Sequence, residues 1–320
     1  MKKKLNGLII TYCYPPYESP ESFVTYKLVN ALSKHCNLTI IKPRIERSKY
    51  IYQNLLKTNI NEIDIKIPFY VKRLLSIKRL PIRPDRFIFY YPFFKKKLLQ
   101  INTKKYDFFM TRSQFHSSHL LGLFLKKKLK IPWFAHFSDP WFNNPVQKKI
   151  FILEKLSLFF QKKIFSQTDI NMFPLNELKD YFNKQENKDI RKNSIIVPHS
   201  ISQRFKLKKN VTKNYTIRFF GKIYAGRKVK NSLIAISNLV QNNKNIKAEF
   251  YVDDDFFVNY EYLIKKFSSI KFLGYLNYSS YLKKLCETSI LILIDIDEDY
   301  GNLFFQSKLV DYIQSYRPIL

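Results

Sequence analysis

The feature that most constrains this chain is a regular alternation of short apolar segments with amphipathic ones. Residues 5–11 (LNGLIIT) are predicted to form a buried strand, and residues 37–43 (NLTIIKP) the next one. Between them lies SPESFVTYKLVNALSKH, in which Ser19 suits an N-cap, Pro20 suits the first helical turn and apolar residues recur at helical spacing. A strand, a helix and a strand in this order predict a parallel, doubly wound sheet.

The alternation runs twice along the chain. A polar, basic stretch at residues 201–214 interrupts it. We therefore predict an α/β protein with two Rossmann-like doubly wound domains, residues 1–200 and 215–320, joined by this linker and facing each other across a cleft. The second run stops at RPIL, which resembles the start of a strand, so the second domain is expected to be incomplete and the chain truncated. Further strands are expected at residues 106–113, 131–137, 169–174, 194–200, 215–220, 245–252, 269–274 and 289–295.

Composition adds a strong positive charge. The 320 residues carry a formal net charge of +31, which favours an anionic partner. A general bias towards Lys, Asn, Ile, Tyr and Phe also explains much of the excess of positive charge.

The three cysteines, Cys13, Cys36 and Cys286, form no CxxC pair, which indicates reduced thiols in the cytoplasm. Because no apolar run approaches the ~20 residues of a membrane span, we expect a cytoplasmic protein, with peripheral attachment to the inner face of the cytoplasmic membrane left open.

The stretch TIRFFGKIYAGRKVKN (residues 216–231) places cations where a strand ends. In open α/β sheets ligands bind beyond the carboxyl ends of strands. The layout resembles the start of the second domain in family 4 glycosyltransferases of the GT-B fold, in which Gly-Arg and a Lys five positions on reach the diphosphate of a nucleotide-sugar. Lys222 and Arg227 occupy these places with the residue types exchanged. The resemblance implies that both cations are catalytic, stabilising the leaving diphosphate, and that Gly221 binds the donor.

The segment SKLVDYIQSYRPIL (residues 307–320) resembles the nucleotide-sugar-binding segment of the same family. Asp311 falls where the second Glu of a Glu-x7-Glu motif accepts hydrogen bonds from ribose, whereas the first Glu falls at Leu303. Ser307 and Lys308 begin a predicted helix whose backbone N–H groups could bind the diphosphate. The resemblance implies that Ser307, Lys308 and Asp311 bind the donor; an exposed helix face is the alternative.

In the first domain, TRSQFHSSHLLGLFLKKKLKIPWFAHFSDPW resembles a segment of bacterial enzymes that build surface polysaccharides, such as lipopolysaccharide. Relatives often carry His-Asp at this strand end, and Asp139 aligns with that Asp while Ser138 takes the place of the His. The resemblance implies that Asp139 is catalytic and orients an acceptor hydroxyl. The weaker candidates are His136, His116 and His119.

The first loop, YPPYESPES, lies where relatives usually carry a pair of glycines. The helix that follows can still offer backbone N–H groups to an anion, although a loop with side chains approaches a ligand less closely. Ser19, Glu21 and His136 are therefore candidates for an acceptor and phosphate loop.

These resemblances imply a hexosyltransferase-like glycosyltransferase that moves a sugar from a nucleotide-sugar to a surface-glycan acceptor, either lipid-linked or polysaccharide, with retention of configuration. The nucleotide-sugar is a substrate and no cofactor is expected. No metal is expected either, because Lys222 and Arg227 would supply the electrostatic stabilisation. The acidic residues Asp295, Asp297 and Asp299 are the one cluster that argues otherwise.

The sequence leaves two alternative functions open. The chain could be a non-catalytic truncated remnant, or a basic protein that binds nucleic acid or a membrane. Aromatic and basic residues interleave at residues 67–98, but no helix-turn-helix spacing, zinc pattern or RNP-like stretch accompanies them. We therefore expect no nucleic-acid partner, and docking of residues 67–98 on anionic lipid headgroups is the favoured interpretation of this region.

Overall fold

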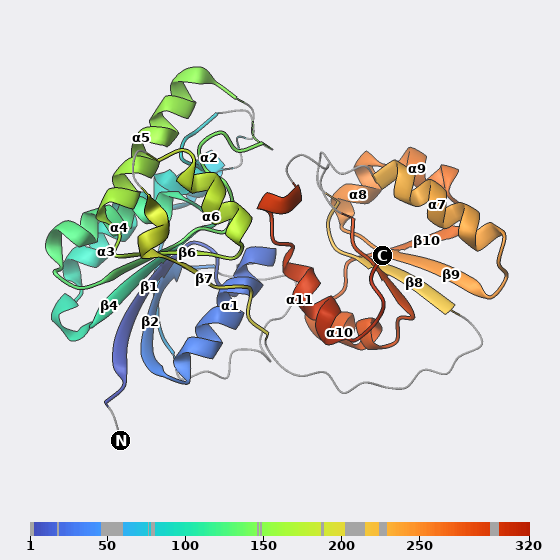
Figure 1. The fold of residues 1–320 in the computed structure, drawn as a ribbon, viewed down its shortest axis with the longest axis horizontal. Coiled ribbons are helices and arrows are strands. Elements are labelled where there is room, and N and C mark those ends of the chain that lie inside the picture. The colour runs from blue at the N-terminus through green and yellow to red at the C-terminus, as the bar shows by residue number, and fades with distance from the viewer. Residues whose placement is uncertain are drawn as a thin grey trace. The chain divides into compact units, whose positions relative to one another are not determined.

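The computed structural model describes residues 3–17, 19–45, 60–75, 77, 81–145, 147, 149–186, 189–201, 215–223, 229–294 and 301–320. The chain divides into two compact units (Figure 1). The first comprises Met1–Ser202 and Asn302–Phe305, and the second comprises Gln203–Gly301 and Gln306–Leu320. Apart from Ile201, the predicted linker lies outside the described residues.

The first unit contains a seven-stranded sheet in the order β3-β2-β1-β4-β5-β6-β7, and every neighbouring pair is parallel. The strand order reverses between β1 and β4, which pair with each other. Such a switch point is where open α/β sheets bind ligands, beyond the carboxyl ends of the strands. The strands are β1 (Leu5–Thr11), β2 (Cys36–Pro43), β3 (Asn61–Ile65), β4 (Phe108–Arg112), β5 (Trp133–His136), β6 (Ile170–Phe173) and β7 (Ser194–Ile196).

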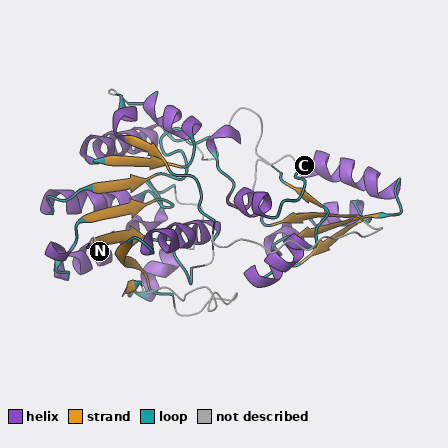
Figure 2. Ribbon diagram, turned by 60° about the horizontal axis from the view of Figure 1, so that its bottom comes forward, coloured by secondary structure: helices purple, strands orange, loops and turns teal. Residues whose placement is uncertain are grey.

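Both faces of this sheet are buried. In β1, Leu8 and Ile10 pack into one hydrophobic layer and Ile9 into the other. Because alternate strand residues point to opposite faces, an apolar run such as LIIT requires cover on both sides. Helices flank the strands accordingly (Figure 2). They are α1 (Pro20–Ser33), α2 (Phe69–Leu75), α3 (Tyr91–Gln100), α4 (Ser117–Lys128), α5 (Phe151–Gln167) and α6 (Asn176–Asn183), with 3-10 turns η1 (Arg86–Tyr90), η2 (Thr103–Lys105) and η3 (Ile190–Asn193).

The region that lacked a sequence pattern, residues 44–105, contributes β3, α2, η1 and α3. Its aromatic residues pack around Tyr12 of the loop after β1, with ring centroids 5.4 Å away for Phe87 and 4.9 Å away for Phe94. Both phenylalanines are buried. Many aromatic residues at 67–98 therefore belong to the hydrophobic core, and only some of them can contribute to an exposed binding surface.

The second unit contains a four-stranded parallel sheet in the order β10-β9-β8-β11. The segment RPIL begins to extend it, because Ile319 bridges Leu291 in parallel and the Leu320 N–H donates to the Leu291 carbonyl over 2.8 Å. Its strands are β8 (Tyr215–Phe220), β9 (Ile246–Tyr251), β10 (Ile270–Leu273) and β11 (Ile290–Ile292). Its helices are α7 (Val229–Gln241), α8 (Asp254–Asn259), α9 (Glu261–Lys266), α10 (Tyr278–Cys286) and α11 (Ser307–Gln314); the 3-10 turn η4 (Gly301–Leu303) precedes α11.

The positions of these elements follow the predicted alternation. The predicted strand at 215–220 and the helix at 229–241 coincide with β8 and α7. At the start of α1, the Ser19 hydroxyl accepts a hydrogen bond from the Ser22 N–H over 3.1 Å, so the predicted cap is confirmed. Across the described residues, the helices are too short or too polar to cross a membrane.

Candidate functional site

A sharp turn follows β8 in the second unit. Gly221 has φ +114°, a conformation that residues with side chains rarely adopt, and its N–H donates to the Tyr251 carbonyl over 2.9 Å. A β-carbon at this position would lie 3.0 Å from Nζ of Lys308. The backbone conformation therefore favours glycine here, and a β-carbon would also press on the end of the Lys308 side chain.

Lys308 brings the start of α11 to the same strand end. Its Nζ donates to the Phe220 carbonyl over 2.7 Å and lies 4.3 Å from the centroid of the Phe219 ring. The N-cap residue of α11 is Gln306, whose side chain makes no capping hydrogen bond within the described part of the chain. An ammonium group and a helix N-terminus therefore lie beside the Gly221 turn, a combination that suits an anion.

Lys222 follows the turn directly. Its Nζ lies 2.8 Å from Oδ2 of Asp253 and 3.8 Å from Oδ2 of Asp255, and its side chain remains 43% exposed. The ion pair with Asp253 holds the ammonium beside the end of β9 and offsets part of its charge. Arg227, the second predicted cation, lies outside the described residues, as do Asp295, Asp297 and Asp299.

Asp311 is only 5% exposed, so the alternative of an exposed helix face is wrong for this residue. The Tyr281 hydroxyl donates to its Oδ2 over 3.5 Å. Burial, with the Asp311 carboxylate as a further cause, raises the pKa of Tyr281 well above its ordinary value. Ser307 is the first residue of α11. Leu303, the position at which the motif would place its first Glu, is buried.

The first unit has its own polar cluster at the carboxyl ends of β1, β4 and β5. Buried Arg112 lies at its centre: one Nη is 2.7 Å from Oε1 of Glu21, and its Nε donates to the Thr25 hydroxyl over 2.8 Å. The Ser138 hydroxyl donates to the same Glu21 oxygen over 2.8 Å. Burial raises the pKa of Glu21 even though the Arg112 charge lowers it.

These contacts change the interpretation of the first loop. The Ser19 hydroxyl caps α1 and Glu21 forms the buried ion pair, so both side chains already have structural partners. Their part in an acceptor and phosphate loop stays a prediction. Ser138, which takes the place of a His in relatives, joins Glu21 to the Ser113 carbonyl, to which its hydroxyl lies within 2.9 Å.

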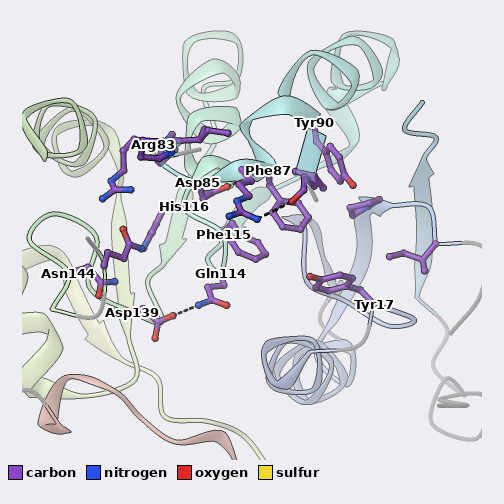
Figure 3. A pocket seen from close by; sticks show the side chains of 18 residues that line it. Tyr17, Arg83, Asp85, Phe87, Tyr90, Gln114, Phe115, His116, Asp139 and Asn144 are labelled. Atoms are coloured by element: carbon purple, nitrogen blue, oxygen red, sulfur yellow. Dashed lines mark hydrogen bonds between the residues drawn. The ribbon is translucent and has the colours of Figure 1, made fainter. Parts of the chain in front are cut away.

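Asp139 lies at the edge of this cluster. Its Oδ2 accepts a hydrogen bond from Nε2 of Gln114 over 2.8 Å (Figure 3). Burial raises the pKa of Asp139 to about 7, and the negative charge of Glu21 contributes to the same shift. The carboxyl group therefore changes charge near neutral pH and can accept a hydrogen bond from a hydroxyl group.

The three candidate histidines occupy different places. His116 lines the pocket described below, stacks on Trp141 at 4.8 Å between centroids, and has its pKa lowered by burial to about 3. His119 bonds through Nδ1 to the Thr111 hydroxyl over 2.8 Å. His136 is buried, and burial lowers its pKa well below the ordinary value. The pocket lining contains neither His119 nor His136, and their part in acceptor binding stays a prediction.

A pocket of about 590 Å³ opens beside Asp139, entirely within the first unit (Figure 3). Phe87 and Phe115 form a stacked aromatic wall with centroids 4.0 Å apart. Asp85 accepts hydrogen bonds from the Ser117 N–H and hydroxyl over 2.8 and 2.7 Å, and burial raises its pKa to about 6. Other lining residues are Tyr17, Arg83, Arg86, Tyr90, Gln114, His116 and Asn144.

Sequence reasoning missed Asp85, Gln114 and the aromatic wall. Asp85 carried a signal, because an Asp that follows Pro84 and precedes a helical turn is a typical cap, and it does cap η1 through the Phe87 N–H. No sequence signal indicated the aromatic wall, since Phe87 and Phe115 meet only in the tertiary structure. Among the residues that the structure describes, no group of three or more His, Cys, Asp or Glu side chains is arranged to hold a metal ion.

No protein-family model and no curated protein matches the chain. Solved structures do match. HepE from Anabaena, in complex with UDP and glucose, has a TM-score of 0.65 at 10% identity, covering 98% of this chain and 80% of that one. WaaG, a glycosyltransferase involved in lipopolysaccharide biosynthesis, has a TM-score of 0.59 at 13% identity, with 98% and 80% covered.

A proposed UDP-N-acetylglucosamine 2-epimerase from Listeria monocytogenes is also similar, with a TM-score of 0.57 at 11% identity, covering 99% of this chain and 78% of that one. Each of the two units is an α/β unit with a parallel sheet, and this organisation together with the structural neighbours identifies the architecture. The chain therefore has the GT-B fold, built of two Rossmann-like units.

Proposed function

We propose that this protein is a glycosyltransferase that transfers a sugar from a nucleotide-sugar donor, bound by the second unit, to a glycan acceptor bound by the first. One observation carries the proposal: the Gly221 turn, followed directly by Lys222, lies at the carboxyl end of β8, and Lys308 joins the N-terminus of α11 to the same strand end. This combination suits a diphosphate. HepE, solved with UDP and glucose, and S. aureus MnaA, solved with UDP and similar to this chain with a TM-score of 0.59 at 10% identity, support a nucleotide ligand.

The chemistry follows from the charges. When the bond between the anomeric carbon and the diphosphate oxygen breaks, its electron pair leaves with the nucleotide and negative charge builds on the diphosphate. The ammonium groups of Lys222 and Lys308 stabilise that charge, and Arg227 is the predicted third cation. We infer that these cations make a divalent metal unnecessary. Transfer should then proceed unchanged in EDTA, and dependence on added Mg²⁺ would contradict this part of the proposal.

Asp311 and Ser307 complete the proposed donor site. The buried Asp311 carboxylate, close to the Tyr281 hydroxyl, is suited to accept hydrogen bonds from the ribose hydroxyls. Ser307 opens α11, so its backbone N–H belongs to the helix N-terminus that meets the diphosphate.

The pocket in the first unit is the proposed acceptor site. Its aromatic wall of Phe87 and Phe115 suits the apolar face of a sugar ring, while Asp85 and Asp139 suit its hydroxyl groups. Asp139 would orient the attacking hydroxyl. The hydroxyl oxygen bonds to the anomeric carbon as the bond to the diphosphate oxygen breaks, and the hydroxyl proton passes to that leaving oxygen. We propose a surface-glycan acceptor and retention of the anomeric configuration, which NMR of the product anomer would test.

The deciding experiment is a screen of UDP, GDP and their sugars by thermal shift, followed by turnover of the stabilising donor with glycan acceptors. A Lys308→Ala variant should lose the shift, whereas Lys230→Ala, at an exposed position of α7, should keep it. Release of nucleotide only when an acceptor is present supports transfer. Conversion of the donor sugar into an epimer without an acceptor would favour an epimerase instead, as the Listeria monocytogenes neighbour illustrates.

A further inference from the structure

Helix α5 has an unusual distribution of polar and apolar residues. Its buried positions include Ser157 and Gln161, whereas Phe151, Ile152 and Phe159 are 74%, 76% and 56% exposed. The exposed apolar residues recur at helical spacing and lie on one face. The helix also covers the core through buried Ile164 and Phe165. Apolar side chains of this size gathered on its exposed face mark an interaction surface.

The same face is positively charged. Nζ of Lys155 lies 4.3 Å from the centroid of the Phe151 ring, and Nζ of Lys163 lies 5.5 Å from that of Phe159. The single acidic residue in the α5 sequence, Glu154, forms an ion pair with Arg83 at 3.0 Å. The exposed face of α5 therefore combines aromatic and aliphatic side chains with lysines.

Helix α2 repeats this combination. Phe69 and Tyr70 are 77% and 67% exposed, and Lys72 and Arg73 follow them in a helix that contains no acidic residue. Both helices belong to the first unit (Figure 1). We call the exposed faces of these two helices the basic apolar surface.

We propose that the basic apolar surface docks on an anionic phospholipid membrane. Phe69, Tyr70, Phe151 and Ile152 would enter the boundary between headgroups and acyl chains, while the lysines meet lipid phosphates. A second copy of the chain would place like charges against each other. Duplex DNA would pair with the lysines but leave the phenylalanine and isoleucine side chains in water. An anionic membrane, with charged headgroups over an apolar interior, satisfies both kinds of side chain.

The position of this surface links it to the pocket. Leu75, the last residue of α2, lines the pocket, and so does Arg83, which is held by Glu154 of α5. Docking would therefore bring the pocket next to the lipid headgroups, where a lipid-linked acceptor would be presented. This last step rests on the proposed function, whereas docking itself does not.

Co-sedimentation of the full chain with phosphatidylcholine vesicles, with and without phosphatidylglycerol, tests the proposal. We expect binding that requires phosphatidylglycerol and weakens when salt is raised. The Phe151→Ser, Phe159→Ser double variant should weaken partition by at least about tenfold, because two exposed aromatic residues lose their apolar contact. A matched control is the Val258→Ser, Tyr262→Ser variant in the second unit, whose side chains are 80% and 62% exposed; it should bind as the parent does.

Several outcomes would overturn the proposal: equal binding by both double variants, binding to duplex DNA but not to vesicles at physiological salt, or a concentration-dependent dimer abolished by the Phe151→Ser, Phe159→Ser changes without any vesicle binding. The thermal shift with UDP should be the same in both double variants. Loss of vesicle binding with an intact UDP shift supports docking. Absence of a UDP shift in the parent would contradict the proposed function and leave the vesicle result standing.

Discussion

The ammonium of Lys308 donates a hydrogen bond to the carbonyl of Phe220 over 2.7 Å, although the two residues are 88 positions apart. This contact joins the start of α11 to the turn after β8. Two segments that separately resemble nucleotide-sugar-binding motifs are therefore in direct contact. The positions of the cation and of the helix N-terminus are fixed by the protein itself.

Lys308→Ala should weaken UDP binding by at least about tenfold, because a hydrogen bond to a charged group contributes roughly 1.5–3 kcal/mol. Isothermal titration calorimetry measures the dissociation constant. Lys230→Ala removes an equal charge from the exposed surface of α7 and serves as the control. Equal losses in both variants would show that net charge, not this site, attracts the nucleotide.

Gly221→Ala should lower the free energy of unfolding by about 1–3 kcal/mol, since alanine is strained at φ +114° and its β-carbon would lie 3.0 Å from Nζ of Lys308. It should also weaken UDP binding, because Lys308 must shift. Gly274→Ala is the matched control, as a β-carbon there would meet no described atom within 4 Å. Urea denaturation of the two variants gives the comparison, and similar losses would argue against a special role for the Gly221 turn.

Asp139→Asn should separate stability from activity. Burial raises the pKa of Asp139 from 3.8 to about 7, so between these values the folded protein holds a proton that the unfolded chain has released. The contribution of this group to stability is therefore lost as pH rises through that window. The variant should melt about 2–4 °C higher than the parent at pH 8 and show little difference at pH 4.

The same variant should lose at least about tenfold in transfer rate, because a neutral amide orients an acceptor hydroxyl less well. Initial rates at saturating donor measure this loss. A melting-temperature change of the same size at both pH values, or an unchanged rate, would remove Asp139 from its proposed role.

Arg112→Met should destabilise the first unit by about 3–5 kcal/mol, because it leaves the Glu21 carboxylate buried without its partner at 2.7 Å. Adding Glu21→Gln to this variant should restore part of the loss. A double-mutant cycle followed by chemical denaturation measures the coupling. Additive effects of the two changes would mean that the ion pair contributes little beyond its separate hydrogen bonds.

Local sequence was informative wherever a signal depends on neighbouring residues. The apolar run at residues 5–11 predicted β1, and Ser19 with Pro20 predicted the start of α1. The apolar stretch ending at Gly221 predicted β8 and the turn that follows it. These features could be predicted because strand periodicity, capping and the conformational freedom of glycine act within a few residues.

From the sequence, the aromatic and basic residues at 67–98 are interpreted as a surface that docks on anionic lipid headgroups, in preference to nucleic acid. The structure divides them: Phe87 and Phe94 pack around Tyr12, while Phe69 and Tyr70 remain exposed. Composition could not make this division, because burial depends on which helix faces meet the sheet. The exposed face of α5 was missed for the same reason.

The sequence by itself determined the two β/α runs, their strand ends and the cations placed there. Only the tertiary structure decided that Lys308 meets Phe220, that Asp311 is buried and that Asp85, Phe87 and Phe115 enclose a pocket with Asp139. The physical reason is the separation along the chain of the residues that interact. Hydrogen-bonded turns and periodic apolar faces are local, whereas a site is made by packing segments that are distant in the chain, and the chain order alone does not encode the distances between them.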